Sequence, residues 1–373
     1  MVRKEGKFRI ILGSTKLMVI LGFLCMLSNV SHSGEHNLSF AARADSIGKS
    51  MTSEPASDIA PSDHGSRDIL EKCWTPLELA GSKQDKQIER LRHPDLTPPR
   101  NTRPSQNDHP VPGNMQKSIR RVDLDSGHKY IALTFDLCER SNEKAGYDAD
   151  IVNYLRKNKI KATFFAGGKW MASHPDKTIQ LMADPLFELG NHAWTHGNMR
   201  LLSAKEMDEQ ILWTQAEYEL LRDELIKKAS DCHVVSSELE RIPKRMQLFR
   251  FPYGTCKPEA LDKLAVYGLK AIQWDVVTGD PAKNQNADGI AKTVLTQAKP
   301  GSIVIGHANG RGHGTAEALP IFIPELIKRG YKFVTVSELL AMGPVIASQE
   351  CYELKPCDNQ RYDKIFGKGT GAE

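Results

Sequence analysis

Residues 131–142 read "IALTFDLCERSN", and strands that end on polar groups in this way recur along the chain. The first five residues are predominantly apolar, which is typical of a strand buried inside a sheet. This run ends on a carboxylate, Asp136, and a thiol at Cys138 and a second carboxylate at Glu139 follow directly. A buried strand that stops on such groups indicates a functional site at its carboxyl end, where (β/α) folds gather their chemistry.

Strand-like and helix-like stretches alternate from about residue 119 to residue 340. Apolar runs typical of buried strands lie at residues 130–135, 161–168, 187–194, 248–253, 269–277, 302–307 and 331–336. Amphipathic stretches typical of helices lie at residues 147–159, 177–185, 203–229, 257–268, 287–298 and 315–330. This alternation predicts a parallel sheet with helices outside it. With about seven strands, we expect an α/β fold of the distorted (β/α) barrel type rather than an open doubly wound sheet.

Composition and motifs disfavour two classes of partner. The 50 basic and 46 acidic residues of the 373-residue chain are interspersed, so no basic stripe of the kind that nucleic-acid binding needs is present in the sequence. The glycine-rich stretch "GHANGRGHG" at residues 306–314 lacks the GxGxxG spacing, and the sequence contains no P-loop motif. We therefore expect no nucleic acid and no bound nucleotide.

The N-terminus has the pattern of a secretory signal. Residues 1–9 are basic, residues 17–27 are apolar, and small polar residues follow. A membrane span needs about 20 apolar residues, and residues 13–16 interrupt this run, so an uncleaved anchor is the less favoured alternative. We expect a signal peptide over residues 1–33 and an exported protein, periplasmic or secreted, that meets a membrane only through this signal.

The segments outside the alternating region read as extensions. Residues 34–118 hold a stretch without periodicity and then a proline-rich linker, and we expect this N-terminal extension to be partly disordered. Residues 119–345 form the predicted barrel domain, and residues 346–373 form a C-terminal tail. The sequence carries no signal for an oligomeric state.

Polar side chains with catalytic potential follow several of the predicted strands. Asp136, Arg250 and His307 each lie at or near a strand end. His192 and His196 follow the third strand four residues apart, so on one helical turn they face the same side, as a divalent metal site requires. Completed by a carboxylate, such a site polarises a carbonyl and lowers the pKa of bound water. The alternative is a histidine pair that only packs or caps the turn.

Five motifs extend this pattern into a family resemblance. In chain order they are "TFD", "NHAWTH", "RFPYG", "WDVVTGDP" and "IVIGH". This set, over roughly residues 119–340, resembles the polysaccharide deacetylase family, the NodB-homology domain of carbohydrate esterase family 4. The resemblance implies a distorted barrel of seven strands. It also implies zinc-type, metal-dependent hydrolysis of N-acetyl, sometimes O-acetyl, groups on sugars, with cobalt or another divalent ion able to substitute.

The resemblance also implies roles by position. The residues it assigns are Asp136 as catalytic base, Arg250 as the group that orients it, His192 and His196 as metal ligands, Tyr253 as a backbone oxyanion donor, His307 as general acid and Ile305 as lining of the acetyl pocket. Trp194 lies between the two histidines, where it either stacks on a sugar ring or packs.

The first departure from the family pattern concerns the third metal ligand. The family usually has a second aspartate directly after the first, but Leu137 occupies that position and has no ligand atom. We expect Glu139 to take the ligand role, then Asp136, and last Cys138, because a thiolate outside the cell is prone to oxidation. A metal-free site is the remaining alternative.

The second departure lies in "WDVVTGDP". The family commonly has an aspartate there that pairs with the motif arginine, whereas this chain has Val277. Asp275 or Asp280 is therefore expected to hold Arg250 and so to tune the base.

Six cysteines follow the predicted signal, and an even number in an exported protein indicates disulfides. Cys138 and Cys256 both follow site motifs at the barrel mouth, so we expect them to form a disulfide. Two free buried thiols are the alternative. In the tail, Cys351 and Cys357 pair with each other, or one of them pairs with Cys73.

These observations together predict an exported, metal-dependent hydrolase that removes acetyl groups from a glycan. Peptidoglycan, chitin oligomers, an exopolysaccharide and an acetylated xylan all fit as substrates. A metal-free hydrolase of another non-peptide C–N bond is the first alternative. The second is an inactive barrel that binds glycan without turning it over.

Overall fold

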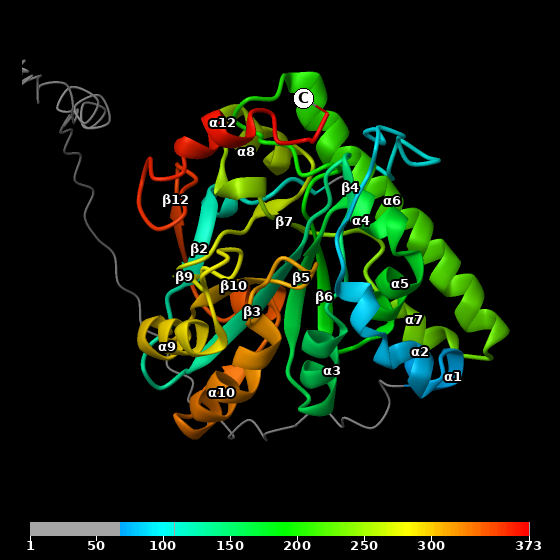
Figure 1. The fold of residues 1–373 in the computed structure, drawn as a ribbon, viewed down its shortest axis with the longest axis horizontal. Helices are drawn as coiled ribbons and strands as arrows, with labels where there is room; N and C mark the ends of the chain where they lie inside the picture. The colour runs from blue at the N-terminus through cyan, green and yellow to red at the C-terminus, as the bar shows by residue number, and fades with distance from the viewer. Residues whose placement is uncertain (1–67, 108, 373) are drawn as a thin grey trace, which may run out of the picture. The chain divides into compact units, whose positions relative to one another are not determined.

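The computed structural model describes residues 68–107 and 109–372. The predicted signal segment and the first part of the predicted extension, residues 1–67, lie outside the described residues. Within the described ranges, no helix combines the length and hydrophobicity that a bilayer crossing requires. Figure 1 shows a curled central sheet with helices packed around it.

The centre of the fold is a parallel sheet with the strand order β8-β7-β6-β5-β3-β10-β9. The strands of this sheet are β3 (Tyr130–Leu137), β5 (Ala162–Ala166), β6 (Phe187–Asn191), β7 (Leu248–Phe249), β8 (Lys270–Ala271), β9 (Val276–Val277), β10 (Ile303–His307) and β11 (Lys332–Phe333), which pairs with the start of β3. They coincide with the seven apolar runs of the sequence, and the predicted α/β class is confirmed.

A single extended segment joins the two ends of this strand order. β8 and β9 are only four residues apart, and each pairs with a different neighbour, β7 and β10 respectively. The amide of Ile272 donates to Phe249 O at 2.8 Å, and the amide of Asp275 donates to Ile303 O at 3.2 Å. The sheet therefore curls back on itself, which confirms the expected distorted barrel over the open sheet.

Helices cover the outside of the barrel (Figure 1). The longer ones are α3 (Ala149–Lys157), α5 (Pro175–Ala183), α6 (Ala204–Asp231), α8 (Pro258–Val266), α9 (Ala287–Gln297) and α10 (Thr315–Lys328), as the amphipathic stretches predict. The short ones are α1 (Asp68–Cys73), α2 (Pro76–Ala80), α4 (Gly168–Ser173), α7 (Ser236–Glu240), α11 (Val336–Leu340) and α12 (Arg361–Phe366). The longest, α6, begins at a capping box in which Ser203 and Glu206 each accept a hydrogen bond from the other's amide.

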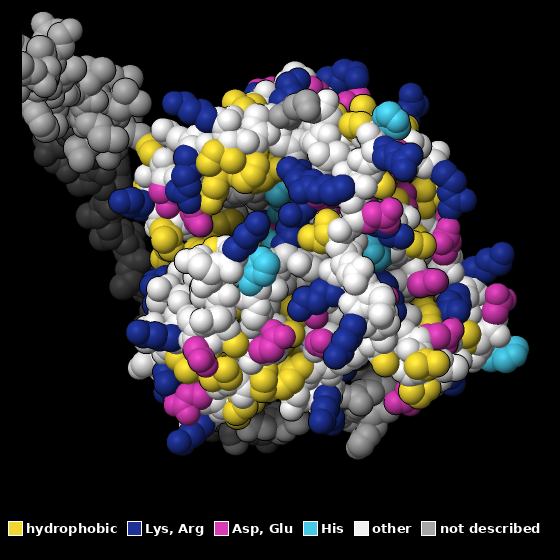
Figure 2. All heavy atoms as spheres, in the orientation of Figure 1, with side chains coloured by type: hydrophobic (Ala, Val, Ile, Leu, Met, Phe, Trp, Pro, Cys, Tyr) yellow, Lys and Arg dark blue, Asp and Glu magenta, His cyan; other side chains and the backbone are white. Residues whose placement is uncertain are grey.

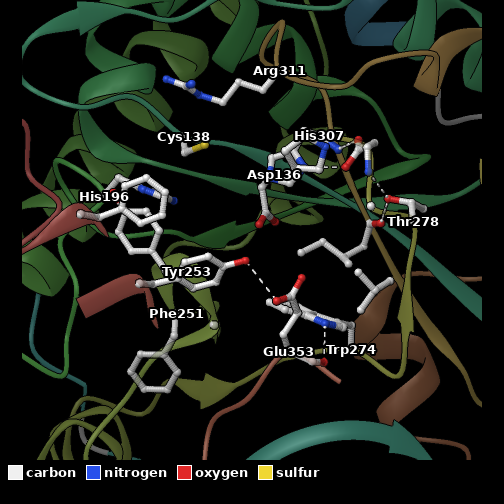
Figure 3. A pocket seen from close by; sticks show the side chains of 18 of the residues that line it. Asp136, Cys138, His196, Phe251, Tyr253, Trp274, Thr278, His307, Arg311 and Glu353 are labelled. Atoms are coloured by element: carbon white, nitrogen blue, oxygen red, sulfur yellow. Dashed lines mark hydrogen bonds and ion pairs between the residues drawn. The ribbon is translucent and has the colours of Figure 1, made fainter. Parts of the chain in front are cut away.

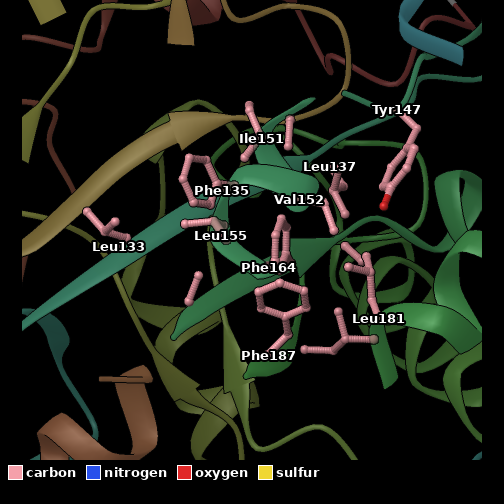
Figure 4. Packing of buried hydrophobic residues seen from close by; sticks show 14 of the residues in the cluster. Leu133, Phe135, Leu137, Tyr147, Ile151, Val152, Leu155, Phe164, Leu181 and Phe187 are labelled. Atoms are coloured by element: carbon pink, nitrogen blue, oxygen red, sulfur yellow. The ribbon is translucent and has the colours of Figure 1, made fainter. Parts of the chain in front are cut away.

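The two faces of β3 explain how the barrel aims its polar groups. Successive side chains of a strand point to opposite faces. The odd-numbered positions from 131 to 137 pack in the apolar layer between sheet and helices, with Phe164 and Ile151 (Figure 4). Ala132 packs in a second apolar cluster, with residues of β7 and β10. Asp136 has the same parity as Ala132, so it points away from the helix layer.

The N-terminal extension from residue 68 onward is ordered against the barrel. Its two-residue strand β1 (Glu89–Arg90) pairs with β4 (Glu143–Lys144). Where the extension meets the barrel domain, β2 (Ser118–Val122) pairs antiparallel with β12 (Val345–Ser348). The predicted proline-rich linker lies along α6. There Arg100 Nη2 contacts Glu224 at 2.7 Å, and the Ser105 amide donates to Glu219 at 2.8 Å.

The expected cysteine pairing is wrong. Within the part of the chain that the structure describes, disulfides join Cys73 to Cys232 and Cys256 to Cys351, and Cys138 is a buried free thiol. Cys256 lies at the start of α8 beside a cluster that includes Cys351, whereas Cys138 faces the barrel mouth. The first disulfide ties α1 to the end of α6, and the second ties the C-terminal tail to the barrel.

Candidate active site

A pocket of about 350 Å³ opens at the carboxyl ends of the barrel strands. Six of the residues that line it are Asp136, Cys138, His196, Tyr253, Ile305 and His307. Figure 3 shows Asp136, Cys138, His196 and His307 converging from different segments on one space. On the molecular surface, histidine side chains are visible in a hollow whose rim carries Lys and Arg side chains (Figure 2).

A buried arginine holds the Asp136 carboxylate in place. Arg250 has no exposed surface, and its Nη1 donates to Asp136 Oδ1 at 2.9 Å and to Thr134 Oγ1 at 2.7 Å. The rest of the guanidinium donates to the carbonyls of Ile272 and Gln273 at 3.3 and 3.2 Å. The guanidinium thus makes four hydrogen bonds, and one of them is the charged hydrogen bond to the Asp136 carboxylate.

The charge on Asp136 is favoured by its neighbours. Burial alone would raise the pKa of this carboxyl, but His192 and Arg250 outweigh it and hold the pKa below its ordinary value. The second oxygen, Oδ2, lies 3.5 Å from His192 Nε2. Asp136 is therefore ionised at neutral pH and has one oxygen directed toward the histidines.

The expected partners of Arg250 have other roles. Asp275 accepts hydrogen bonds from Ser302 Oγ and the Ile303 amide, both at 2.9 Å, at the amino end of β10. Asp280 belongs to His307 instead. The prediction that one of these aspartates would hold Arg250 is wrong, because the guanidinium already has its donors satisfied by Asp136 and backbone carbonyls.

His307 is fixed by the Asp280 carboxylate. Its ring Nδ1 lies 2.8 Å from Asp280 Oδ1, and its amide donates to Oδ2 at 2.7 Å. Thr315 Oγ1 donates to the same carboxylate. Burial favours the neutral ring, but the Asp280 charge outweighs it and raises the pKa of His307. With Nδ1 engaged, Nε2 is the ring atom available to the pocket.

The two histidines of "NHAWTH" are arranged as ligands. His192 Nδ1 donates to the Arg250 carbonyl at 2.9 Å, which leaves Nε2 with a free lone pair. That Nε2 is buried and has no hydrogen-bond partner among the described residues. The ring of His196 lies 4.9 Å away, and burial lowers the pKa of both rings, which keeps them neutral.

Cys138 joins this pair, and Glu139 does not. The ligand atoms of Cys138, His192 and His196 all lie within 4.8 Å of one another. Imidazole and thiolate are the donors that zinc-type ions prefer, so the cluster fits a divalent metal. Burial raises the pKa of the Cys138 thiol to about 12, so without an ion the sulfur carries its proton at neutral pH.

Glu139 as the expected third ligand is wrong. Its Oε2 accepts hydrogen bonds from the Ala145 amide and from Ser173 Oγ, both at 2.8 Å. The physical reason is alternation. Asp136 and Cys138 face the pocket, whereas Leu137 and Glu139 face away from it, toward the surrounding segments.

Three non-glycine residues around the site have a left-handed backbone. They are Ala193, His196 and Tyr253, with φ of 66°, 61° and 58°. Such conformations cost of order 1–3 kcal/mol each and persist only where the surroundings enforce them. Two side chains brace the histidine loop, because Asn191 Oδ1 accepts from the Ala193 amide at 2.9 Å and Gln210 accepts from two amides further along.

Comparisons with known proteins find similarity to one family. Residues 123–224 match the family model described as polysaccharide deacetylase. This match covers about a quarter of the chain, and together with the relatives described next it supports a polysaccharide deacetylase family for this protein.

Curated relatives and solved structures match more than half of this chain. It is 28% identical over 264 residues to the peptidoglycan-N-acetylglucosamine deacetylase PgdA of Listeria monocytogenes, covering 71% of this chain and 48% of the relative. It is 31% identical over 218 residues to the peptidoglycan-N-acetylmuramic acid deacetylase PdaC of Bacillus subtilis, covering 58% and 40%. Among solved structures, a CE4 family pseudoenzyme from Bacillus anthracis matches with 26% identity and a TM-score of 0.48, covering 59% of this chain and 68% of the other. The chain thus spans about half the length of the first of these relatives.

The C-terminal tail forms a wall of the pocket that the sequence did not predict. Phe366 of α12 stacks on the Tyr253 ring with centroids 4.7 Å apart, and Tyr362 also lines the pocket. The Tyr253 hydroxyl donates to Gly369 O at 2.9 Å. The apolar residues of this tail show no regular period, so its position in the fold could not be predicted from the sequence.

Of the other residues expected to meet substrate, one lies in the pocket and one does not. Ile305 lines the pocket. Trp194 is buried and packs edge-to-face on Trp213, with centroids 6.1 Å apart, so it has the packing role.

The sequence also did not predict a group of charged residues at the pocket, around Glu143. Arg90, Arg140 and Arg311 all contact the buried carboxylate of Glu143.

Proposed function

We propose that this chain is a metal-dependent hydrolase that removes acetyl groups, above all N-acetyl groups, from a glycan. The observation that carries the proposal is the placement of an Arg250-held carboxylate and an Asp280-held imidazole in one pocket beside a histidine pair. The surroundings lower the pKa of Asp136 and raise the pKa of His307, which suits the division of roles between a general base and a general acid. The names of the relatives support an acetylated glycan as substrate, with peptidoglycan as the first candidate.

A divalent ion, zinc or a substitute such as cobalt, held by His192, His196 and a third donor from the end of β3 would polarise the acetyl carbonyl and lower the pKa of a water molecule. The chain's own groups then carry the proton transfers. Asp136 accepts a proton from the water as its oxygen bonds to the acetamide carbon. The backbone N–H of Tyr253 is the proposed donor to the oxyanion.

Collapse of the tetrahedral carbon breaks the C–N bond. His307 gives its proton to the departing nitrogen, so that acetate and a free amino sugar leave. Ile305 provides an apolar surface for the acetyl methyl group. The aromatic rings of Tyr253, Tyr362 and Phe366 line the pocket where a sugar ring would stack.

We also propose that the protein is exported to the periplasm or secreted. The basic and apolar segments at the N-terminus support this, and so do the Cys73–Cys232 and Cys256–Cys351 disulfides, because disulfides persist in oxidising compartments.

The test is acetate release by the full chain from peptidoglycan fragments and chitin oligomers. We expect release that a chelator abolishes and zinc or cobalt restores, and a loss of at least about 100-fold in kcat for Asp136→Asn. Release that survives both treatments would overturn the mechanism and favour a metal-free hydrolase. Saturable sugar binding with no acetate would identify a glycan-binding barrel.

A further inference from the structure

We propose that the thiolate of Cys138 is the third protein ligand of the metal, so that the site is built from two histidines and one cysteine without a carboxylate. This inference rests on the metal dependence proposed above and extends it to the identity of the ligands. Binding requires the thiol to release its proton to solvent, so the sulfur enters the site as an anion.

The cluster itself is the first observation. The ligand atoms of Cys138, His192 and His196 lie within 4.8 Å of one another. His192 is only 1% exposed, and its Nε2 has no hydrogen-bond partner among the described residues. A buried polar atom without a partner costs free energy, so this nitrogen is best explained by an ion that it binds. Its other nitrogen is fixed on a backbone carbonyl, the usual support for a ligating histidine.

The competing carboxylates fit the ligand role less well than the sulfur, although Asp136 Oδ2 lies 3.5 Å from His192 Nε2. Glu139 faces away from the pocket and accepts two hydrogen bonds, from Ala145 and Ser173. Asp136 gives one oxygen to Arg250, and its carboxylate is not part of the three-membered cluster. Asp136 is also the proposed base, and a carboxylate that coordinates the metal has less basicity left to accept a proton from water. Cys138 is the donor that remains at the end of β3.

The surroundings of the sulfur suit a thiolate. Asn309, just after β10, donates from Nδ2 to Cys138 Sγ at 3.0 Å and to the Cys138 carbonyl at 2.7 Å. An N–H donor of this kind orients a metal-bound sulfur and stabilises its charge. The side chain is 5% exposed and free of any disulfide, so neither solvent nor another cysteine competes for it.

This ligand set makes a prediction about the metal. Thiolate and imidazole favour zinc and cobalt, whereas magnesium, calcium and manganese prefer oxygen donors. The site should therefore discriminate against those three ions more strongly than a site with a carboxylate would.

The experiment uses the full chain prepared without oxygen and titrated with Co²⁺ alone. We expect one equivalent to bind with an intense near-ultraviolet sulfur-to-cobalt absorption. Cys138→Ser should lose this absorption and weaken cobalt binding by at least about 10- to 100-fold. Cys138→Asp should recover binding of one equivalent without the absorption. Glu139→Gln is the matched control and should keep both, and far-ultraviolet circular dichroism checks that each variant folds.

The outcomes separate this inference from the proposed function. Wild-type protein that binds cobalt without the absorption, or fails to bind it, would overturn the thiolate ligand, and so would absorption that persists in Cys138→Ser. Acetate release by such a protein would leave the deacetylase activity standing. Sulfur-to-cobalt absorption without acetate release from any acetylated glycan would uphold the ligand and reject the activity.

Discussion

His307 Nδ1 lies 2.8 Å from Asp280 Oδ1, and this contact determines the pH range in which the imidazole can donate a proton. Burial favours the neutral ring, but the Asp280 carboxylate outweighs it and raises the pKa of His307. A general acid must be protonated, so activity is lost as pH rises through this pKa, and a raised pKa extends activity toward alkaline pH. Asp280→Asn should move the alkaline limb of kcat/KM to lower pH and reduce kcat about 10-fold or more, as a pH–rate profile would measure.

Asp275→Asn is the matched control. Its carboxylate accepts from Ser302 and the Ile303 amide instead of from a pocket residue, and asparagine keeps one acceptor oxygen. The control should retain the alkaline limb of the wild type. A limb that stays in place in Asp280→Asn would show that His307 is not the group that titrates there.

The order of polar residues predicted which groups meet in the pocket, but not how they pair. Asp136, Arg250 and His307 could be placed because parallel strands bring their carboxyl ends together. Their hydrogen bonds could not, since they depend on side-chain directions after the strands end. The alternation that points Asp136 and Leu137 to opposite faces was nevertheless readable from the sequence of β3, because a strand has a period of two.

At the scale of elements, α6 carries a buried carboxyl whose ionisation opposes folding. Burial raises the pKa of Glu217 to about 7, above its ordinary value. As pH rises above about 4.5 the unfolded chain loses this proton while the folded chain keeps it, so stability falls until pH passes about 7. Glu217→Gln should therefore be more stable than the wild type by about 1–3 kcal/mol at pH 8, with the difference vanishing near pH 4.

Chemical denaturation at several pH values measures this effect. The exposed Asp223 lies on the same helix, and Asp223→Asn corrects for the change in net charge. A constant difference between wild type and Glu217→Gln across the pH range would refute a buried, protonated carboxyl.

The short helix α12 supplies an aromatic wall of the pocket, and a pair of substitutions tests that role. Phe366 stacks on Tyr253, whereas its neighbour Ile365 is 62% exposed. Phe366→Ala should raise KM for an acetylated oligosaccharide about 3- to 10-fold with kcat little changed, because a sugar loses a stacking surface. Ile365→Ala should leave both constants at the wild-type value. Equal KM values in the two variants would show that Phe366 does not contribute to substrate binding.

The longer elements were predictable because their apolar periodicity is strong. The split of residues 269–277 into β8 and β9 was not, since the segment reads as one apolar run and its two partners lie on different strands. The tail was missed for a different reason. Its order comes from a disulfide and side-chain contacts made across the fold, which leave no local pattern.

At the scale of the whole molecule, the Cys73–Cys232 and Cys256–Cys351 disulfides should have different effects on stability and on substrate binding. Replacing Cys256 and Cys351 with serine should lower the free energy of unfolding by about 2–5 kcal/mol and also raise KM, because this disulfide attaches the tail that lines the pocket to the barrel. Replacing Cys73 and Cys232 should lower stability by a similar amount and leave KM unchanged, because that disulfide joins α1 to α6 outside the pocket. Denaturation curves and steady-state kinetics on both pairs give the comparison, and matching shifts in KM would contradict it.

The segment between β8 and β9 links the charge state of Asp136 to the closure of the barrel. Ile272 and Gln273, which lie in that segment, supply the two carbonyls that receive the Arg250 guanidinium. If the barrel opened between β8 and β9, Arg250 would lose these two carbonyls together with the strand pairing. Asp136 would then lose the guanidinium that favours its ionised form. A partly folded or partly open barrel would therefore be inactive, and activity would appear only when the barrel closes at the end of folding.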